Sequence, residues 1–381
     1  MVATRDQEPQ ATLHSRGLTG AVRSPSARWL TLCAAAVATA LTAAAAAQSA
    51  PKQQLKSPRV GEISRAGEEI SDSIVRASST TRALTPSGYW GGQYKIASGE
   101  LVTIYASNSY AMDPALGQRW ADFLGSLVHG AELSSVTVLL STPAQISRVC
   151  GTDALACYSP QGALLYAPGE DPSSDLSAEA VITHEYGHHV AANRVNTPWD
   201  ALDWGPKRWA SAMQVCARTK SGQLAPGAED PVRYDVNPGE GWAETYRVLN
   251  QHKLGVPESP WEIVSQTLYP SAAALTAAEQ DVVSPWQDDT TTVRSGSISR
   301  VSRTRTYIFS TPLDGALKVA LRSSAGLRVG VDLYASSTRV AHVAGAGALA
   351  RSATVCGVRT YRVKVSELRG RGSFRLSVAE P

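Results

Sequence analysis

Several features that would assign this chain to a common class are missing from it. The 381 residues contain no acidic or basic block, and the formal net charge is only +3. A nucleic-acid-binding protein is expected to carry a dense stripe of Lys and Arg with aromatic residues between them, whereas the arginines here are scattered. No C-x-x-C pair occurs, which argues against a cysteine-ligated zinc site. The sequence therefore predicts no nucleic-acid partner and no zinc finger.

One long hydrophobic run is present near the amino terminus. It extends from Trp29 to Ala47, follows several arginines and ends in small residues. This order is typical of a secretory signal peptide, which we assign to residues 1–50, with cleavage near Ala47 or Ala50. The 19-residue run is also close to the length that spans a bilayer, so an uncleaved membrane anchor is the alternative. We expect a secreted protein whose membrane contact is limited to this segment.

Four cysteines remain when Cys33, which lies inside the hydrophobic run, is set aside. An even number of cysteines in an exported chain predicts disulfide bonds. Cys150 and Cys157 lie seven residues apart in a stretch that we interpret as a loop, and so short a loop is easily closed. Cys216 and Cys356 then pair by elimination.

The composition, 43% hydrophobic and 18% charged, is that of a globular protein, and the length suits more than one domain. Residues 51–85 are polar and are interpreted as a linker or short pro-segment. Residues 86–285 mix alternating strand patterns with helical periodicity, whereas residues 293–381 contain only short alternating strands between turn residues. The predicted fold class is therefore α+β, with a domain of strands and helices followed by an all-β sandwich domain.

Three of the seven histidines fall within the string HEYGHH. We expect a helix over 177–193, on which His184 and His188 lie one turn apart on the same face with Glu185 beside them. Two such imidazoles can bind one zinc ion, and the glutamate can act as general base toward a water molecule. The alternative is a solvated helix face, but the H-E-x-x-H pattern arises by chance in at most about one percent of such sequences. His189 points about 100° away, which suits a surface or outer-shell position.

A catalytic zinc ion needs a third protein ligand. The extended motif with a third histidine is excluded, because Arg194 stands at that position. Glu240 and Glu244 lie four apart on a second predicted helix that begins at Asn237. One of them can bind the metal while the other accepts the free ring N–H of a ligand histidine. Glu240 could instead cap its own helix, because its spacing from Asn237 fits a capping box. Asp235 is a weaker candidate for the third ligand.

HEYGH followed by a helix carrying E-x-x-x-[DE] resembles the gluzincin metallopeptidases, the thermolysin-like group. The resemblance implies a zincin-like catalytic domain in which His184, His188 and Glu240 hold zinc while Glu244 orients His184. It further implies that Tyr234, shortly before the second helix, hydrogen-bonds the developing oxyanion; the alternative is an ordinary tyrosine packed in a loop. The chain departs from thermolysin in having Glu where thermolysin has Asp, and in a long, Trp-rich connection between the two helices. These departures leave the choice between Glu240 and Glu244 open.

Two further expectations come from family resemblance. In the gluzincin fold the strand before the first active-site helix forms a wall of the cleft, which implies that residues 162–169 (GALLYAPG) pair with an extended substrate peptide. Residues 293–381 resemble the bacterial pre-peptidase C-terminal domain in the stretches RTYIFSTPLDGALKVAL, VGVDLYAS and RTYRVKVS. This module implies either binding of substrate or of the cell envelope, or no binding role at all.

The sequence as a whole predicts a secreted zinc endopeptidase that acts on protein or peptide substrates with Glu185 as general base. One alternative is a zinc hydrolase of cell-wall or other non-peptide bonds. The other is a catalytically silent, zinc-containing protein that binds the cell envelope. Glu185 and the lack of a fourth nearby Cys or His argue against the silent protein, because a structural zinc site is closed by four protein ligands.

Overall fold

The computed structural model describes residues 71–74, 86–152, 154–357 and 360–381. The predicted signal peptide lies outside these ranges, as does most of the polar segment that follows it. Within the described ranges, no helix is long and apolar enough to cross a membrane.

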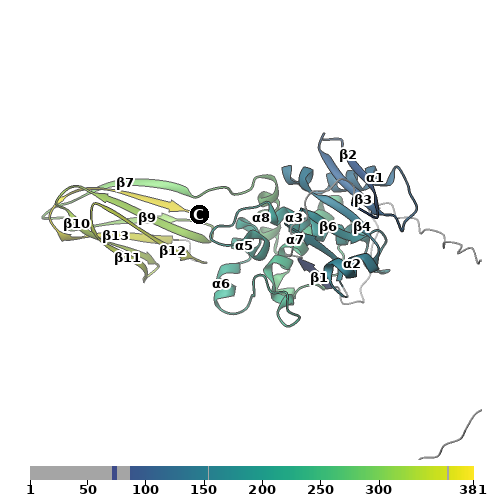
Figure 1. Ribbon diagram of the computed structural model, residues 1–381. Coiled ribbons are helices and arrows are strands. Elements are labelled where there is room, and N and C mark those ends of the chain that lie inside the picture. Colours follow the sequence, from purple (N-terminus) through teal and green to yellow (C-terminus); the bar gives the residue numbers. More distant parts are fainter. Residues whose placement is uncertain (1–70, 75–85, 153, 358–359) are drawn as a thin grey trace, which may run out of the picture. The chain divides into compact units, whose positions relative to one another are not determined.

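A six-stranded mixed sheet forms one layer of the first part of the chain (Figure 1). Its strands are β1 (Ser71–Ile74), β2 (Tyr89–Lys95), β3 (Leu101–Ser107), β4 (Thr137–Ser141), β5 (Ala154–Ser159) and β6 (Leu164–Pro168). Across the sheet they follow the order β1-β5-β6-β4-β3-β2. The pairs β1/β5, β6/β4 and β4/β3 are parallel, whereas β5/β6 and β3/β2 are antiparallel. In this order β5 and β6 are interior strands, and β1 and β2 form the edges.

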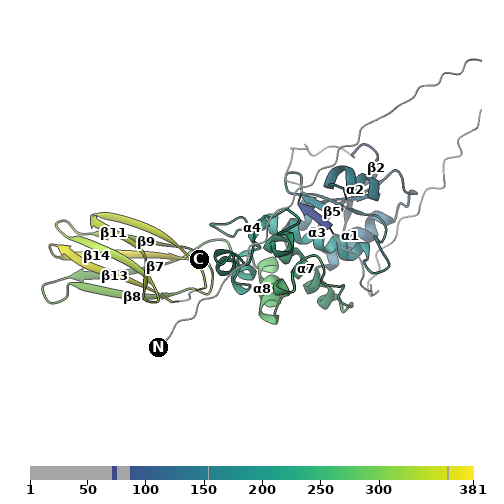
Figure 2. The same cartoon turned by 90° about the horizontal axis from the view of Figure 1, so that it is seen from below.

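Helices pack on this sheet and on one another. They are α1 (Leu116–Ser126), α2 (Pro143–Cys150), α3 (Ala178–Ala192), α4 (Ala201–Trp204), α5 (Lys207–Ala212), α6 (Val215–Lys220), α7 (Pro238–Leu254) and α8 (Ala272–Val283), with short 3-10 turns η1 (Ala131–Ser135), η2 (Tyr234–Val236) and η3 (Gln266–Leu268). Helix α3 lies between the sheet, where it contacts β5 and β6, and helix α7 (Figures 1 and 2). Nearly every residue of α3 is therefore buried, including its histidines and both of its glutamates.

Large aromatic side chains fill the core around α3 and α7. Trp120 of α1, Trp209 of α5 and Trp242 of α7 are fully buried in one hydrophobic cluster. Each such ring removes roughly 150–250 Å² from water, which at about 25 cal/mol per Å² contributes on the order of 4–6 kcal/mol before entropy costs. The Trp242 indole N–H also donates to the carbonyl of Gly187, at 2.8 Å. The core thus fixes α7 directly against α3.

The C-terminal part is a β-sandwich of two four-stranded antiparallel sheets, as predicted. Its strands are β7 (Thr290–Ile298), β8 (Thr304–Ser310), β9 (Gly315–Ser323), β10 (Arg328–Ala335), β11 (Thr338–Ala346), β12 (Ala348–Val355), β13 (Thr360–Arg369) and β14 (Gly372–Glu380). One sheet has the order β11-β10-β13-β8 and the other β12-β9-β14-β7. Alternate residues of β9, β13 and β14 are buried, as the period-two pattern predicts. The chain is therefore a mixed α and β protein with a C-terminal sandwich.

In the connection between α3 and α7, helices α5 and α6 are separated because Gln214 takes a left-handed conformation (φ 56°) that breaks the helix. Local structure differs from the sequence-based prediction in two places. The supposed cysteine loop is built from regular elements, with Cys150 ending α2 and Cys157 inside β5. Four residues of the predicted linker or pro-segment form strand β1, because the free edge of β5 offers backbone groups to pair with.

Both predicted disulfide bonds are present. Cys150 is joined to Cys157, and Cys216 to Cys356. The first ties the end of α2 to β5, whereas the second closes a loop of 140 residues between α6 and the sandwich. Disulfide bonds are consistent with an extracellular protein.

Candidate metal centre

Helix α3 positions the H-E-x-x-H residues. Ser177 caps it by accepting a hydrogen bond from the N–H of Ala180 at 3.2 Å, so the predicted helix begins where expected. His184 and His188 follow one turn apart, with ring centroids 5.0 Å from each other. Both rings are buried, at 2% and 0% exposure. The solvated-face alternative is therefore wrong for these two histidines.

Helix α7 brings an acid to the same place. Asn237 caps α7 by accepting from the N–H of Gly239 at 2.9 Å, and Pro238 occupies the first helical position. Glu240 lies in the first turn, and its Oε2 contacts both histidines. Asn237 therefore caps the helix, and the Glu240 carboxylate faces the two imidazoles.

The glycine of HEYGH allows the two helices to approach. A Cβ atom built on Gly187 would lie 2.9 Å from the Cα of Ala243 and 3.2 Å from the Cβ of Tyr246, both on α7. Real Cβ atoms almost never come that close to backbone, so a side chain here would push the helices apart. The short interhelical distance is what places an acid of α7 within reach of the α3 histidines.

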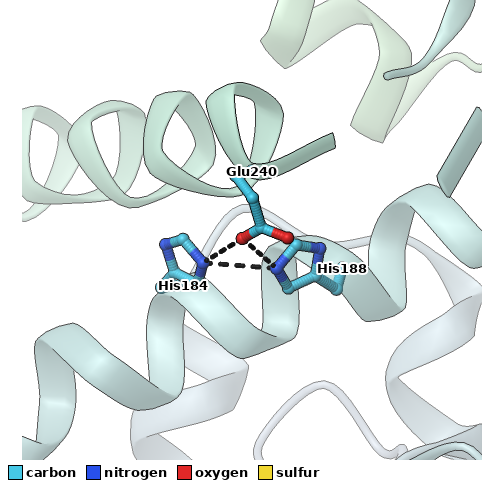
Figure 3. Close-up of side chains that lie close together, drawn as sticks. All are labelled: His184, His188 and Glu240. Carbon is cyan, nitrogen blue, oxygen red and sulfur yellow. Dashed lines mark hydrogen bonds and ion pairs between the residues drawn. The ribbon is translucent and has the colours of Figure 1, made fainter. Parts of the chain in front are cut away.

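Three ligand atoms converge between the helices (Figure 3). The Nε2 atoms of His184 and His188 lie 3.2 Å apart, and Glu240 Oε2 lies 3.4 Å from the first and 3.2 Å from the second. Donor atoms about 2.0–2.1 Å from one tetrahedral ion would be roughly 3.3–3.4 Å from one another. The separations fit three vertices of such a tetrahedron, so this buried group could bind a metal ion.

Glu244 lies behind the first histidine. His184 Nδ1 is 2.9 Å from Glu244 Oε1, and since a carboxylate only accepts, Nδ1 donates its proton there. His184 Nε2 then carries a lone pair directed at the other two ligand atoms. The two acids of E-x-x-x-E are thereby placed differently, because Glu240 faces both imidazoles and Glu244 contacts the far side of one.

A buried arginine holds Glu244 in turn. Arg247 donates from Nε to Glu244 Oε1 at 2.8 Å and from Nη2 to Oε2 at 2.5 Å. Its remaining donors bond to Gln251 and to the carbonyls of Ser259 and Pro260. Burial by itself raises the pKa of the Glu244 carboxyl, but the charge and hydrogen bonds of Arg247 outweigh burial and bring that pKa to about 2. Glu244 is therefore a charged acceptor for His184 throughout the neutral pH range.

A cleft opens beside the cluster. Its polar lining comes from His184, Glu185, Glu244 and Arg247. Its apolar lining comes from β5, α3 and two loops, namely Leu155, Ala156, Leu176, Ala180, Val181, Pro260 and Ile263. Glu185 lines this cleft and is fully buried, and it follows His184, a candidate metal ligand, in the sequence. A carboxylate so placed can exchange a proton with a molecule bound in the cleft.

Other predicted site residues have different surroundings. Asp235 is exposed and does not belong to the buried group, so it is not brought together with the histidines. Tyr234 is half-buried in η2, just before α7, and its catalytic role stays a prediction. Of the two positions predicted for His189, surface or outer-shell, the surface position is wrong. It is buried against β5, with Tyr158 Oη at 3.0 Å from its Nδ1 and the carbonyl of Glu132 at 2.9 Å from its Nε2.

The sequence did not indicate two parts of this site. Arg247 follows Glu244 by three residues, and only its burial shows that it pairs with that acid. Strand β5 was taken for a loop, although Leu155 and Ala156 line the cleft. The predicted peptide-pairing strand, β6, pairs with β4 over Leu164–Pro168 and with β5 over Leu164–Tyr166, so a peptide finds no free edge over Leu164–Tyr166.

Comparisons with known proteins do not assign a family. No family model matches the chain, and no curated protein is significantly similar to it. Solved structures similar to part of it include the pre-peptidase C-terminal domain of collagenase from Bacillus anthracis, at 18% identity over 23% of this chain and 87% of that chain, with a TM-score of 0.22. A mitogen derived from Yersinia pseudotuberculosis matches at 10% identity over 24% of this chain and 87% of that chain, with a TM-score of 0.21. A periplasmic inhibitor of g-type lysozyme from Aeromonas hydrophila matches at 11% identity over 24% of this chain and 86% of that chain, with a TM-score of 0.20. At these TM-scores the similarities decide nothing about function.

Proposed function

We propose that this chain is a zinc-dependent endopeptidase with a zincin-like catalytic domain of the gluzincin type. The observation that carries the proposal is the convergence of His184, His188 and Glu240 next to a cleft that is lined by His184 and Glu185. Two imidazole nitrogens and one carboxylate oxygen form the ligand set that catalytic zinc uses in peptidases, with a fourth position left to solvent or substrate. The donor separations fit such an ion.

Each residue has a separate task in the proposed reaction. A zinc ion bound there would supply Lewis-acid activation of water and of the scissile carbonyl. Glu185 accepts the proton of the attacking water and passes it to the leaving amine. Glu244, held by Arg247, fixes the tautomer and direction of the His184 ring. Tyr234 hydrogen-bonds the oxygen of the carbonyl under attack.

We further propose that the protein acts outside the cell on protein or peptide substrates. The hydrophobic run and the two disulfide bonds support export. The sandwich would then contact the cell envelope or serve only as a structural module. Hydrolysis of cell-wall or other non-peptide bonds uses the same metal chemistry, and it becomes an outcome of the activity test.

Metal content tests the ligand set first. We expect about one zinc ion per chain in the wild type and in Glu185→Gln. We expect none in His188→Ala or Glu240→Ala, because each of these variants lacks a residue that binds the metal directly. Glu244→Ala should keep zinc but bind it roughly 10–100-fold more weakly. Elemental analysis and competition with a chelator measure both. If Glu240→Ala keeps full zinc while Glu244→Ala does not, the order of the two acids is the reverse of the one proposed.

Activity tests the reaction. We expect cleavage of casein that a chelator abolishes, and a loss of about 10²–10⁴-fold in kcat for Glu185→Gln, since the general base is removed. Glu179→Gln is the matched control, because Glu179 is buried on the same helix but does not line the cleft. Chelator-sensitive activity confined to cell-wall fragments would replace the peptidase by a cell-wall hydrolase. Zinc binding without any hydrolysis would favour the silent envelope-binding protein.

A further inference from the structure

Strand β1 occupies the one edge of β5 that would otherwise be open. The backbone of Ser71 pairs with Ala154, Ser73 with Cys157 and Ile74 with Tyr158, all in parallel register. The opposite edge of β5 pairs with β6. Among the described strands, β5 is therefore an interior strand only because β1 lies on it. Without β1, it would present a row of unpaired N–H and C=O groups.

This edge belongs to the strand that borders the candidate active site. Leu155 and Ala156 of β5 line the same cleft as His184 and Glu185. Ala156 also packs with Leu176, Ala180 and Val181 in a small cluster separate from the main core, which forms the apolar side of the cleft. A peptide that extended along the edge of β5 would thus run beside the proposed metal centre.

Strand β5 is held rigidly enough to act as a template. The disulfide bond of Cys157 anchors it to α2, and the hydroxyl of Tyr158 is bonded to His189 on α3. An extended peptide binds such an edge through main-chain hydrogen bonds, which do not depend on its sequence. Strand β1 makes main-chain pairing of this kind, in cis.

We propose that β1 occupies the edge of β5 to which an extended polypeptide substrate would bind. Substrate can then pair with β5 only after Ser71–Ile74 has left that edge. The inference rests on the proposed peptidase function. A tethered strand competes at an effective concentration in the millimolar range, so even four residues can hold back substrate. The segment before residue 86 is then inhibitory, and its displacement or removal activates the protein.

A proline pair in β1 tests this on the full chain. Successive residues of a strand point their N–H groups to opposite sides, so Asp72→Pro/Ser73→Pro removes one donor that faces β5 whichever residue supplies it. Asp72→Ala/Ser73→Ala is the matched control, because it changes both side chains and keeps both donors. With oxidised insulin B chain as substrate, we expect the proline variant to show a KM lower on the order of tenfold and an unchanged kcat. The alanine variant should behave as the wild type.

Hydrogen exchange gives a readout that does not need activity. In the Glu185→Gln background, amides of residues 154–159 should exchange faster in the proline variant than in the alanine variant. Adding insulin B chain should protect them again in the proline variant alone. A synthetic peptide of residues 69–76 (EISDSIVR), added in trans, should restore protection and inhibit the proline variant.

The outcomes separate this inference from the peptidase proposal. If neither variant cleaves any peptide but insulin B chain protects β5 only in the proline variant, the edge is competitive and the catalytic proposal fails. If both variants cleave peptide with equal KM, and exchange of β5 is the same in both, then β1 does not compete with substrate. Should the double proline variant not fold, the single variants Asp72→Pro and Ser73→Pro are compared, because only one of them removes the donor that faces β5. One of the two should lower KM and speed exchange of residues 154–159 while the other behaves as the wild type, and equal behaviour of both would overturn the proposal.

Discussion

The α3–α7 contact and the core of the sandwich bury opposite kinds of side chain. Between the helices, ionisable side chains are buried together and face one another, including His184, His188, Glu240, Glu244 and Arg247. The hydrophobic cluster between the two sheets of the sandwich consists of apolar side chains that come from alternating strand positions. Burying charge costs free energy unless each group finds a partner or a metal. Burying these ionisable groups between α3 and α7 therefore costs free energy, which indicates a functional site. The hydrophobic cluster of the sandwich has no such cost.

Among the variants considered, removal of the buried arginine should lower the free energy of unfolding most. Arg247→Met leaves Glu244 buried without its cation, and we expect a loss of about 3–5 kcal/mol in the free energy of unfolding. The control is Arg362→Met in the sandwich, where the guanidinium lies exposed, 4.8 Å from the centre of the Tyr334 ring, and little change is expected. Urea denaturation measures both. Equal losses in the two variants would mean that Glu244 does not depend on Arg247.

A cavity in the sandwich should destabilise without touching the metal centre. Leu321 of β9 is 1% exposed, and Leu321→Ala should cost about 2–5 kcal/mol through lost burial and an unfilled cavity. Zinc content, measured by elemental analysis on the folded protein, should stay that of the wild type. A loss of zinc in this variant would show that the sandwich core supports the site.

Two glycine substitutions compare how closely the backbone is packed at the α3–α7 contact and in the sandwich. Gly187→Ala places a methyl group 2.9 Å from the Cα of Ala243, and we expect a loss of about 1–3 kcal/mol from overpacking together with weaker zinc binding. Gly330→Ala in β10 meets nothing nearer than 3.5 Å and should be tolerated. Thermal unfolding and chelator competition compare the two. Unchanged zinc affinity in Gly187→Ala would mean that the helix spacing does not set the ligand geometry.

The smallest effect concerns pH. Burial raises the pKa of Asp281 on α8 to about 6, although it accepts from the N–H groups of Arg208 and Trp209. A carboxyl whose pKa is higher in the folded state stabilises the fold while protonated, so this contribution is lost as pH rises through 6. Between pH 5 and pH 7 the wild type should lose roughly 1 kcal/mol of stability from this group. Asp281→Asn should flatten that slope in urea titrations, and an unchanged slope would assign it to another group.

Much of the site could be read from local patterns. Ser177 and Asn237 mark two helix starts because a capping side chain is a local signal, and both helices begin where predicted. The spacing of His184 and His188 needs only helix geometry to place them on one stripe. The sandwich was also foreseeable, because alternation in residues 293–381 reports a strand with one buried face.

Other features could not be read, because they depend on contacts between distant segments. Residues 154–159 form a strand since β6 and β1 lie beside them, and nothing local distinguishes such a strand from a loop closed by Cys150 and Cys157. The order of strands across the sheet decides that β6 is an interior strand. Arg247 pairs with Glu244 only because α7 is buried on all sides near its middle.

The sequence by itself determined which side chains could bind a metal and that two of them share a helix face, because helical periodicity and residue chemistry are local properties. Only the tertiary structure decided between Glu240 and Glu244 as the acid that faces both histidines. The close approach of α3 and α7 at Gly187 sets the distance and rotation of one helix against the other, and that places Oε2 of Glu240 at 3.2–3.4 Å from the two imidazole nitrogens.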